Sequence, residues 1–415
     1  MKRKALALFM CTAMAAGLMT GCGSSGAKSE APAASEAPAA SEAAEAPAAS
    51  EAPASSEAAA SEAAASEAPA ASGAAASEAA ASEAPAADTP ANEVAKNEGE
   101  AISVGFAQVG AESDWRTAST ESVKSAFSEE NGYNLIFNDA QQKQENQIKA
   151  IRDFISQDVD YIILDPVTET GWDQPLQEAS DAGIPVIIVD RMVDVKDPSL
   201  YTAWIGSDFE LEGKKACGYL KAYLDAKGYT GDVNIVDIQG TIGASAQIGR
   251  TKGFDDAAKA NGWNVVAQQT GEFTQAKGQE VMESILKQSD NINVVYCEND
   301  NEAFGARDAI EAAGKKVGSD IANGDILLMS FDCTKAGLTD TLNGSILVNT
   351  ECNPLYGPVL TQMIQKLKAG ETLDHDTYIE EAQFSADDSV TSINVDGTDY
   401  PVTILTQEVL DARAY

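Results

Sequence analysis

Short hydrophobic runs alternate with amphipathic stretches from residue 101 to the end of the chain. The segments 161–164 and 186–189 are apolar at every position, as expected of strands that are buried on both faces of a parallel sheet. Strand-like runs cover Ile102–Val109, Tyr133–Asn138, Tyr161–Asp165, Pro185–Asp190, Thr202–Gly206, Val233–Gln239, Trp263–Thr270, Ile292–Cys297, Ile326–Ser330 and Ser345–Thr350.

Helical spacing of apolar positions fills the intervals between these runs. It covers Thr117–Glu129, Gln144–Gln157, Trp172–Ala182, Leu211–Ala226, Gln247–Ala260, Gln275–Gln288, Ala303–Ala313 and Pro358–Ala369. Repeated strand–helix alternation predicts an α/β fold with doubly wound parallel sheets that carry helices on both faces. Residues 101–415 exceed what one hydrophobic core usually supports, so we expect two domains.

The amino terminus has the features of an export signal. Lys2, Arg3 and Lys4 precede an apolar stretch from Ala5 to Met19, which is too short for a stable membrane span. Gly21-Cys22 resembles a bacterial lipobox, so we expect a lipoprotein signal peptide at 1–21 and a lipidated Cys22. The protein would then lie outside the cytoplasm, anchored to the cell membrane. The alternative is an ordinary secretory signal in which Cys22 is incidental.

Residues 22–97 consist mostly of Ala, Ser, Glu and Pro in irregular repeats. This segment has no aromatic residue and few branched aliphatic ones, so it cannot bury enough apolar surface to offset the entropy of ordering. We expect a disordered, acidic tether between the anchor and the folded part.

Charge and cysteine content exclude several classes of protein. The net charge of −37 argues against binding to nucleic acid, and no helix-turn-helix pattern precedes the α/β region. The cysteines of the folded part follow no zinc-binding spacing, and the chain has one His, so we expect no metal and no cofactor. We expect buried free thiols, although a disulfide among them stays open. They are Cys217, Cys297, Cys333 and Cys352.

The segment after the first strand carries unusual chemistry for a connection. Trp115 and Arg116 follow Glu112 and Asp114 on the expected turn at the carboxyl end of Ile102–Val109. Ligands bind at such strand ends in open α/β sheets. Trp offers a flat apolar face, and Arg offers a fork of donors for paired hydroxyls or a carboxylate. The alternative is a core Trp beside a solvated Arg.

Polar residues also end several later strands. They include Asp165, Asp190, Asp237, Gln239, the run 298–300 and Asp332. Each could be a helix cap or a turn residue. Together they suggest two sheet edges that line one cleft.

These residues occur in a familiar order. Residues 104–110 and 112–116, the run Gln141-Gln142-Lys143-Gln144-Glu145-Asn146-Gln147, Asp190-Arg191 and the segment 239–245 resemble sugar-binding proteins of the ribose/galactose type, the cluster B receptors of ABC importers. Within that group the resemblance is greatest to galactofuranose-binding receptors. It implies two lobes joined by three crossovers, with the ligand in the cleft between them. The lobes would be 101–208 with 354–385 and 209–353 with 386–415.

The resemblance also implies the ligand contacts. They are Trp115, Arg116, Asp190, Arg191, Arg250, Phe273, Asn299 or Asp300, Asp332 and Glu351, with Phe273 opposite Trp115. Aromatic rings can cover the C–H faces of a sugar while carboxylates and guanidinium groups bind its hydroxyls. A purely structural Asp190–Arg191 ion pair is the alternative for those two residues.

Three functions are therefore compared. The first is a monomeric, lipid-anchored receptor that delivers a monosaccharide, galactofuranose or a related furanose, to the permease of an ABC importer. The second is a receptor of the same fold that feeds a sensor kinase or chemoreceptor. The third is a glycosidase that uses two clustered carboxylates, but arginines at 191 and 250 would keep such carboxylates ionised. We expect a binding protein without enzymatic activity.

Overall fold

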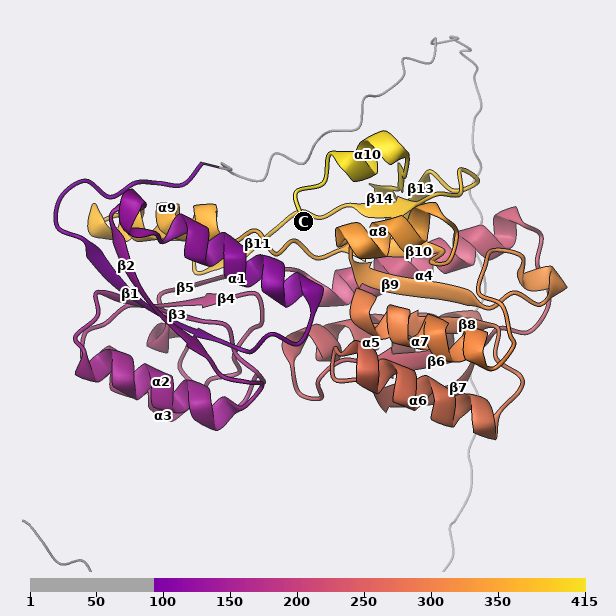
Figure 1. Ribbon diagram of the computed structural model, residues 1–415, viewed down its shortest axis with the longest axis horizontal. Coiled ribbons are helices and arrows are strands. Elements are labelled where there is room, and N and C mark those ends of the chain that lie inside the picture. The colour runs from indigo at the N-terminus through magenta and orange to yellow at the C-terminus, as the bar shows by residue number, and fades with distance from the viewer. Residues whose placement is uncertain (1–92) are drawn as a thin grey trace, which may run out of the picture. The chain divides into compact units, whose positions relative to one another are not determined.

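The computed structural model describes residues 93–415, which form two parallel-sheet lobes (Figure 1). The expected signal peptide and Cys22 lie outside the described residues. No helix in the described part is long and apolar enough to cross a membrane.

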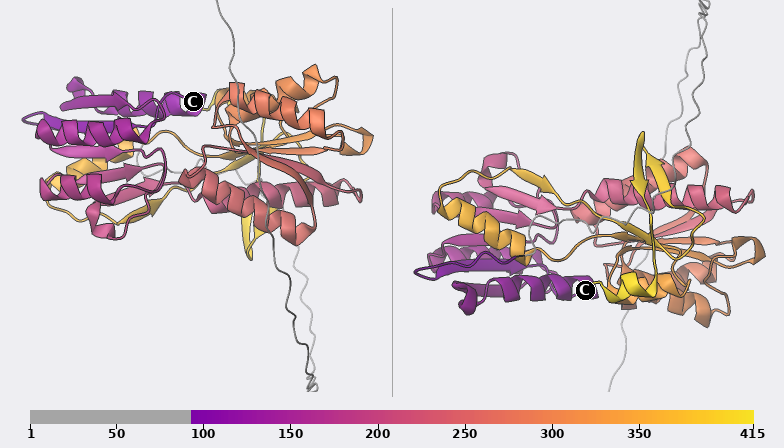
Figure 2. Two further views of the ribbon diagram at one scale, coloured as in Figure 1. Left: turned by 90° about the horizontal axis from the view of Figure 1, so that it is seen from below. Right: turned by 90° about the horizontal axis from the view of Figure 1, so that it is seen from above.

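The first lobe is built on a six-stranded sheet in the order β11-β5-β4-β3-β1-β2, with every neighbouring pair parallel. Its strands are β1 Ile102–Gln108, β2 Tyr133–Asp139, β3 Tyr161–Leu164, β4 Val186–Val189, β5 Ala203–Gly206 and β11 Asp376–Tyr378. Its helices are α1 Asp114–Ala126, α2 Gln144–Ser156, α3 Asp173–Asp181 and α9 Gly357–Lys368. Helices lie on both sides of each sheet (Figure 2).

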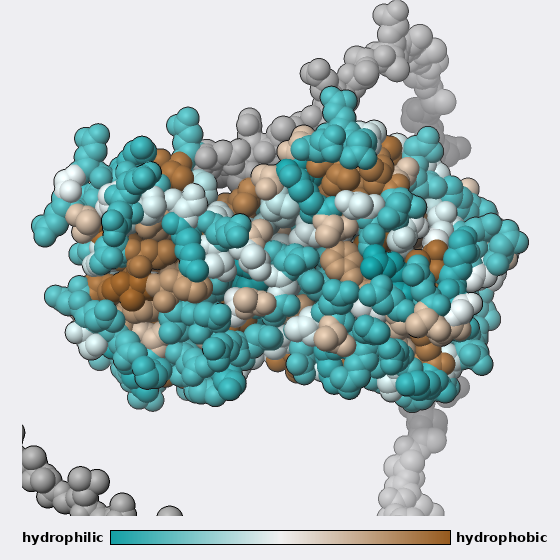
Figure 3. All heavy atoms as spheres, viewed as in Figure 1, coloured by the Kyte–Doolittle hydropathy of each residue, from teal (hydrophilic) through white to brown (hydrophobic). Residues whose placement is uncertain are grey.

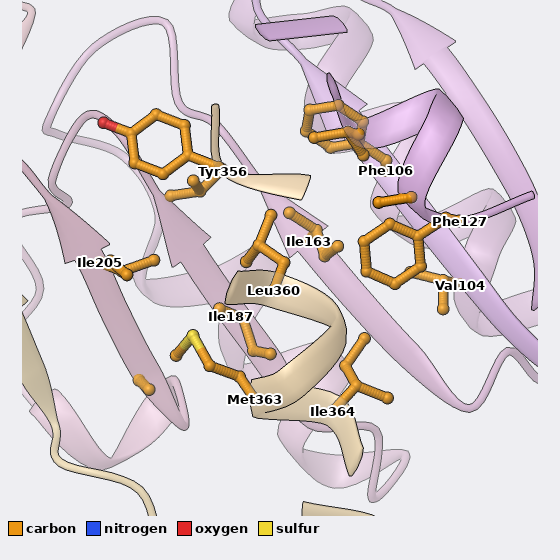
Figure 4. Close-up of a cluster of buried hydrophobic side chains, with 14 of the residues drawn as sticks. Val104, Phe106, Phe127, Ile163, Ile187, Ile205, Tyr356, Leu360, Met363 and Ile364 are labelled. Atoms are coloured by element: carbon orange, nitrogen blue, oxygen red, sulfur yellow. The ribbon is translucent and has the colours of Figure 1, made fainter. Parts of the chain in front are cut away.

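Alternate residues of these strands enter two separate hydrophobic clusters. Ile163 and Ile187 face α1 and α9, whereas Ile162 and Ile188 face α2 and α3. Leu360 and Ile364 of α9 lie over the strands in the first cluster (Figure 4). Successive side chains of a strand point to opposite faces of the sheet, so a strand that is apolar throughout contributes hydrophobic residues to the clusters on both faces.

The second lobe has a seven-stranded sheet in the order β15-β12-β10-β9-β8-β6-β7. Its strands are β6 Asn234–Gln239, β7 Asn264–Thr270, β8 Val294–Cys297, β9 Leu327–Asp332, β10 Val348–Glu351, β12 Gln383–Ser385 and β15 Thr403–Ile404. Its helices are α4 Phe209–Ala226, α5 Ser245–Asn261, α6 Gln275–Gln288, α7 Asp300–Ala312, α8 Lys335–Leu342 and α10 Gln407–Asp411. The hairpin β13 Ser392–Val395 and β14 Thr398–Pro401 packs against α4.

The chain crosses between the sheets three times, after β5, after β10 and between β11 and β12. The third crossing falls before Gln383, because β12 pairs antiparallel with β10 of the second sheet. The expected boundary, which placed residues up to 385 in the first lobe, was therefore wrong, because residues 383–385 belong to the second sheet. Strands of three residues carry too little pattern to reveal which sheet they join.

The segment just before β1 packs against the first lobe. Ala95 donates its N–H to the Thr361 hydroxyl at 3.0 Å, and its carbonyl accepts the Tyr133 hydroxyl at 2.7 Å. Asn97 is buried and binds the Gly132 carbonyl. The end of the expected tether, residues 94–97, therefore belongs to the folded lobe.

The surface is mainly hydrophilic on the face in Figure 3, with hydrophobic residues visible over β1 and β2 and beside α10. The four cysteines of the described part are buried and free, which confirms the expectation of free thiols. They are Cys217, Cys297, Cys333 and Cys352.

Candidate functional site

A cavity of about 290 Å³ lies between the two lobes. Both lobes and the crossovers contribute to its wall, which consists of Glu112, Ser113, Trp115, Arg116, Asp190, Arg191, Phe209, Ala246, Arg250, Phe273, Asn299, Asp332 and Cys352.

The structure brings most of the expected contact residues to this cavity. Two of them, Asp300 and Glu351, are not part of its wall. Of the alternatives at 299 and 300, the cavity includes Asn299. The residues that do line it are Trp115, Arg116, Asp190, Arg191, Arg250, Phe273, Asn299 and Asp332.

Asp300 holds the second lobe together instead. Its carboxylate accepts hydrogen bonds from Ser330 Oγ, Asn349 Nδ2 and both the N–H and hydroxyl of Thr334, at 2.6–3.0 Å. Burial raises the pKa of Asp300 to about 6, and these donors act against that rise. Its side chain faces the strands of its own sheet, so placing it at the cavity was wrong.

Glu351 is likewise satisfied within the second lobe. Its Oε1 accepts from Arg413 Nη2 at 2.6 Å and from the Tyr415 hydroxyl at 3.0 Å, and its Oε2 accepts from the Ala382 N–H. Arg413 and Tyr415 thus bond to the carboxylate that the resemblance assigned to ligand binding.

The helix α1 positions Trp115 and Arg116. It begins at Asp114, with Ser113 as its N-cap, so both residues lie in the first helical turn and not on the expected connecting turn. Trp115 Nε1 donates to the Cys352 carbonyl at 2.6 Å, and the Arg116 guanidinium lies 4.6 Å from the Trp115 ring centroid. These contacts fix the aromatic plane at the cavity wall.

Arg116 joins three carboxylates of the first lobe. Its guanidinium contacts Asp165 through Nη1, Asp190 Oδ2 at 2.9 Å through Nη2, and Glu112 Oε1 at 2.8 Å through Nε. Burial alone would lower the pKa of Arg116, but these carboxylates raise it well above its usual value. Asp190 therefore pairs with Arg116 and not with its chain neighbour Arg191.

Arg191 lies in the same charged group but is less fully paired. Its Nη1 donates to the Val167 carbonyl at 3.0 Å, and its Nη2 lies 3.8 Å from Glu112 Oε1. Its guanidinium stacks over the Phe273 ring of the opposite lobe, 5.1 Å from the centroid. Burial and the neighbouring Arg116 lower the pKa of Arg191.

Arg250 is the cationic group of the second lobe. Its Nε donates to Glu212 Oε2 at 2.7 Å, and its Nη2 lies 3.9 Å from Asp332 Oδ1. Burial raises the pKa of Asp332 well above its usual value, although Arg250 acts in the opposite direction. Arg250 is thus held by its own lobe with its guanidinium at the cavity.

Three cavity residues have left-handed backbone conformations. The φ angles are 61° at Asp190, 59° at Phe273 and 94° at Asp332. Non-glycine residues rarely adopt such angles, and the cost is of order 1–3 kcal/mol at each position. Asp190 directly follows β4, and Asp332 ends β9. The turned backbone directs these side chains to the space between the lobes.

Sequence reasoning missed five wall residues. Glu112 and Ser113 were part of the motif but were not assigned as contacts. Phe209 begins α4 directly after the first crossover, and Ala246 and Cys352 lie at the start of α5 and directly after β10. Phe209 and Cys352 could have been predicted only from their positions beside the crossovers. Because the cavity lies at the hinge between the lobes, residues beside the crossovers contribute to its wall.

Hydrogen bonds between the lobes hold the cavity closed. Asp114 donates its N–H to Asn301 Oδ1 at 3.0 Å, and Met192 donates its N–H to Ser245 Oγ at 2.8 Å. The Glu169 N–H also donates to the Gly243 carbonyl at 2.9 Å. The described structure is therefore a closed arrangement of the two lobes.

Several polar atoms of the wall have no protein partner in the described structure. They are Glu112 Oε2, Arg191 Nε and Asp332 Oδ2. Buried polar groups are normally hydrogen-bonded, so acceptors and a donor remain for a ligand. Within the described residues, the one group of three metal-ligating side chains (Glu212, Cys352 and Glu381) reaches the cavity wall only through Cys352.

Comparison with known proteins identifies the family. A model of the periplasmic binding protein domain matches residues 104–371. The galactofuranose-binding protein YtfQ of Escherichia coli (strain K12) is 48% identical over 274 residues, which cover 65% of this chain and 83% of that protein.

Solved structures agree with this match. A Mycobacterium smegmatis protein in complex with β-D-fucofuranose is 46% identical, with a TM-score of 0.65 over 69% of this chain and 91% of that one. The binding protein of the arabinose ABC transporter from Shewanella sp. ANA-3, bound to α- and β-L-arabinofuranose, is 41% identical, with a TM-score of 0.64 over 69% and 93%. The chain therefore belongs to the periplasmic binding protein family of the ribose/galactose type, whose members bind solutes and are not enzymes.

Proposed function

We propose that this protein captures a monosaccharide in its furanose form between the two lobes and delivers it to an ABC importer. The observation that carries the proposal is a closed interlobe cavity in which aromatic rings meet fixed, charged hydrogen-bonding groups. Trp115 and Phe273 supply apolar surface for the C–H faces of a sugar. Relatives that bind or hold furanoses support the ring form.

The charges of the wall favour a neutral ligand. Arg116 already pairs with Glu112, Asp165 and Asp190, and Arg250 already pairs with Glu212, so these two arginines are balanced without a ligand. A charged ligand would leave this balance uncompensated in a buried site. Hydroxyl groups both donate and accept, so a polyol ring can satisfy the carboxylates and the guanidinium groups together.

Selectivity would come from the free wall atoms. A hydroxyl near Glu112 Oε2 would donate to a carboxylate, and one near Arg191 Nε would accept. A hydroxyl near Asp332 Oδ2 would bond to a carboxyl group whose protonated form is favoured by burial. An epimer that misplaces such a hydroxyl leaves a buried charged group unpaired, which costs about 1–3 kcal/mol or more. We therefore expect discrimination by hydroxyl position and ring form, not by size alone.

Closure would couple binding to delivery. The ligand contacts both lobes only in the closed form, so it shifts the population toward that form. The permease of the importer would then recognise the closed pair of lobes. We further propose that Cys22 carries the lipid anchor and that residues 23–92 link it to the receptor outside the cytoplasm.

Calorimetric titration of the purified full-length protein tests the ligand class. The panel comprises galactose, arabinose, ribose, glucose and synthetic galactofuranosides, which are locked in the furanose ring. One-to-one binding of a locked furanoside, with weak or no ribose binding, is the expected result. Absence of heat with every sugar of the panel would refute the sugar-binding proposal.

The anchor has a separate test. Cys22→Ala should move the protein from the membrane fraction to the soluble fraction of cells, while sugar binding stays unchanged. Cys217→Ala is the matched control, because this thiol is buried in the second lobe. Continued membrane association of the Cys22 variant would contradict lipidation.

A further inference from the structure

A buried cluster of acidic side chains lies where the three crossovers meet. Glu212 is in the first turns of α4, just after the first crossover. Cys352 directly follows β10 in the second, and Glu381 lies in the third, between β11 and β12. Each ligand-type side chain thus lies in, or close after, a different connection between the lobes.

The geometry of the cluster fits a metal ion. A carboxylate oxygen of Glu212, the Cys352 thiol and a carboxylate oxygen of Glu381 all lie within 4.8 Å of one another. The hydroxyl of Ser207 is 2.8 Å from Glu381 Oε1 and 3.5 Å from Cys352 Sγ. Three protein ligands with a hydroxyl or water beside them match the coordination that Zn²⁺ prefers.

One oxygen of the cluster has no partner. Glu212 is 2% exposed, and its Oε2 is bound by Arg250 Nε at 2.7 Å. Its Oε1 accepts no hydrogen bond from any described residue. The Glu212 and Glu381 carboxyl groups also lie within hydrogen-bond reach of each other. Arg250 would then orient a metal-bound carboxylate from outside, as neighbouring groups do at many metal sites.

The charge of the cluster also calls for a cation. Two carboxyls and a thiol meet one guanidinium, and Lys215 Nζ binds the Glu381 carbonyl rather than its carboxylate. A divalent ion with three deprotonated ligands and Arg250 gives a neutral group.

We propose that Glu212, Cys352 and Glu381 bind Zn²⁺ at the hinge between the lobes. The thiolate favours Zn²⁺ over Mg²⁺ or Ca²⁺, which take oxygen ligands. Glu381 is only half-buried, which gives the ion a path from solvent. Bound Zn²⁺ would tie the three crossovers together, next to the cavity wall at Cys352.

Spectroscopic titration with Co²⁺ tests the site without any sugar. The full-length protein is first dialysed against a chelator, and Co²⁺ is added in the absence of phosphate. We expect one equivalent to produce a thiolate-to-cobalt charge-transfer band, which added Zn²⁺ then abolishes. Zn²⁺ calorimetry in two buffers of different ionisation enthalpy should show proton release, because a metal-bound thiol is deprotonated.

Variants identify the ligands. Cys352→Ala should abolish the charge-transfer band, and Glu381→Gln should weaken Zn²⁺ binding by about 100-fold or more while its amide oxygen still accepts from Ser207 and Asn353. Cys297→Ala, a buried thiol in a separate cluster, is the matched control and should bind Co²⁺ as the parent does.

Two outcomes would overturn the proposal. One is the absence of saturable one-to-one binding in the parent protein, in which case Glu212 and Glu381 share a proton instead. The other is an unchanged band in Cys352→Ala together with unchanged affinity in Glu381→Gln. Neither outcome bears on the sugar titration, which is performed separately.

Discussion

The carboxylate of Glu112 links two arginines to the space where the sugar would lie. Its side chain is 2% exposed. Oε1 lies 2.8 Å from Arg116 Nε and 3.8 Å from Arg191 Nη2. Oε2 has no protein partner, and Glu112 lines the cavity. Burial acts to raise the pKa of Glu112, but Arg116 and Arg191 prevail and lower it, so the group is ionised at neutral pH.

Glu112→Gln preserves the shape and removes one acceptor. If the amide oxygen faces Arg116, the NH₂ group replaces the acceptor that a sugar hydroxyl would use. If the amide is turned, its NH₂ group meets two guanidinium groups. Either orientation loses a charge-assisted hydrogen bond worth about 1.5–3 kcal/mol, which corresponds to roughly 10- to 150-fold in affinity.

Calorimetry with the tightest-binding furanoside of the panel measures this loss. Glu178→Gln is the control. Glu178 of α3 pairs with Arg152 of α2 at the surface, so this variant should leave the affinity unchanged. Thermal unfolding shows whether each variant is folded. An affinity within twofold of the parent in a folded Glu112→Gln protein would refute the assignment of Oε2 to the ligand.

Three further predictions concern the cavity and the core. In Gly240→Ala, the added methyl carbon would lie 1.9 Å from the Phe273 ring, so the ring must move. We expect weaker sugar binding, measured by calorimetry, and a free energy of unfolding that is about 1–3 kcal/mol lower, measured by denaturant unfolding. Asp300→Ala should lower the free energy of unfolding by at least about 2 kcal/mol, because four donors lose their acceptor. Sugar affinity should stay within threefold of the parent. A large loss of affinity without a loss of stability would contradict the structural role of Asp300. Burial raises the pKa of Asp237 and Glu302 well above the usual values, so the folded state binds protons more tightly than the unfolded chain. Stability should therefore fall as the pH rises above the ordinary carboxyl values of about 4, and melting temperatures that rise with pH from there would contradict this prediction.

The repeating strand–helix pattern predicted the architecture well, because strands buried on both faces leave an unmistakable apolar signature. Runs such as Ile162-Ile163-Leu164 pair as parallel strands in the structure. Segments after Phe384 were not predicted, since β12 and β15 have three and two residues and alternate too briefly to show a period.

The candidate site was predicted in part. Residues at strand ends could be found from sequence, because the carboxyl edge of a parallel sheet is defined by the strands themselves. Which of two neighbours faces the cavity could not: Asn299 caps α7 through Glu302 N–H, whereas Asp300 begins the helix and turns inward to Ser330 and Thr334. That choice depends on the packing of α7 against β9.

Closure depends on contacts that are individually weak. The hydrogen bonds between Asp114 and Asn301 and between Met192 and Ser245 involve neutral groups, and each contributes about 0.5–1.5 kcal/mol net. The stronger, charge-assisted bonds mostly stay within a lobe, as Arg116 with Asp190 and Arg250 with Glu212 illustrate. A ligand that bonds Glu112 Oε2 and Asp332 Oδ2 would therefore add contacts across the cleft, and the bond to the ionised Glu112 would be charge-assisted. A ligand shifts the populations of the open and closed forms only through the difference between its affinities for them. These bridging bonds would therefore determine the selectivity of the receptor. They would also determine the stability of the closed form that it presents to a transporter.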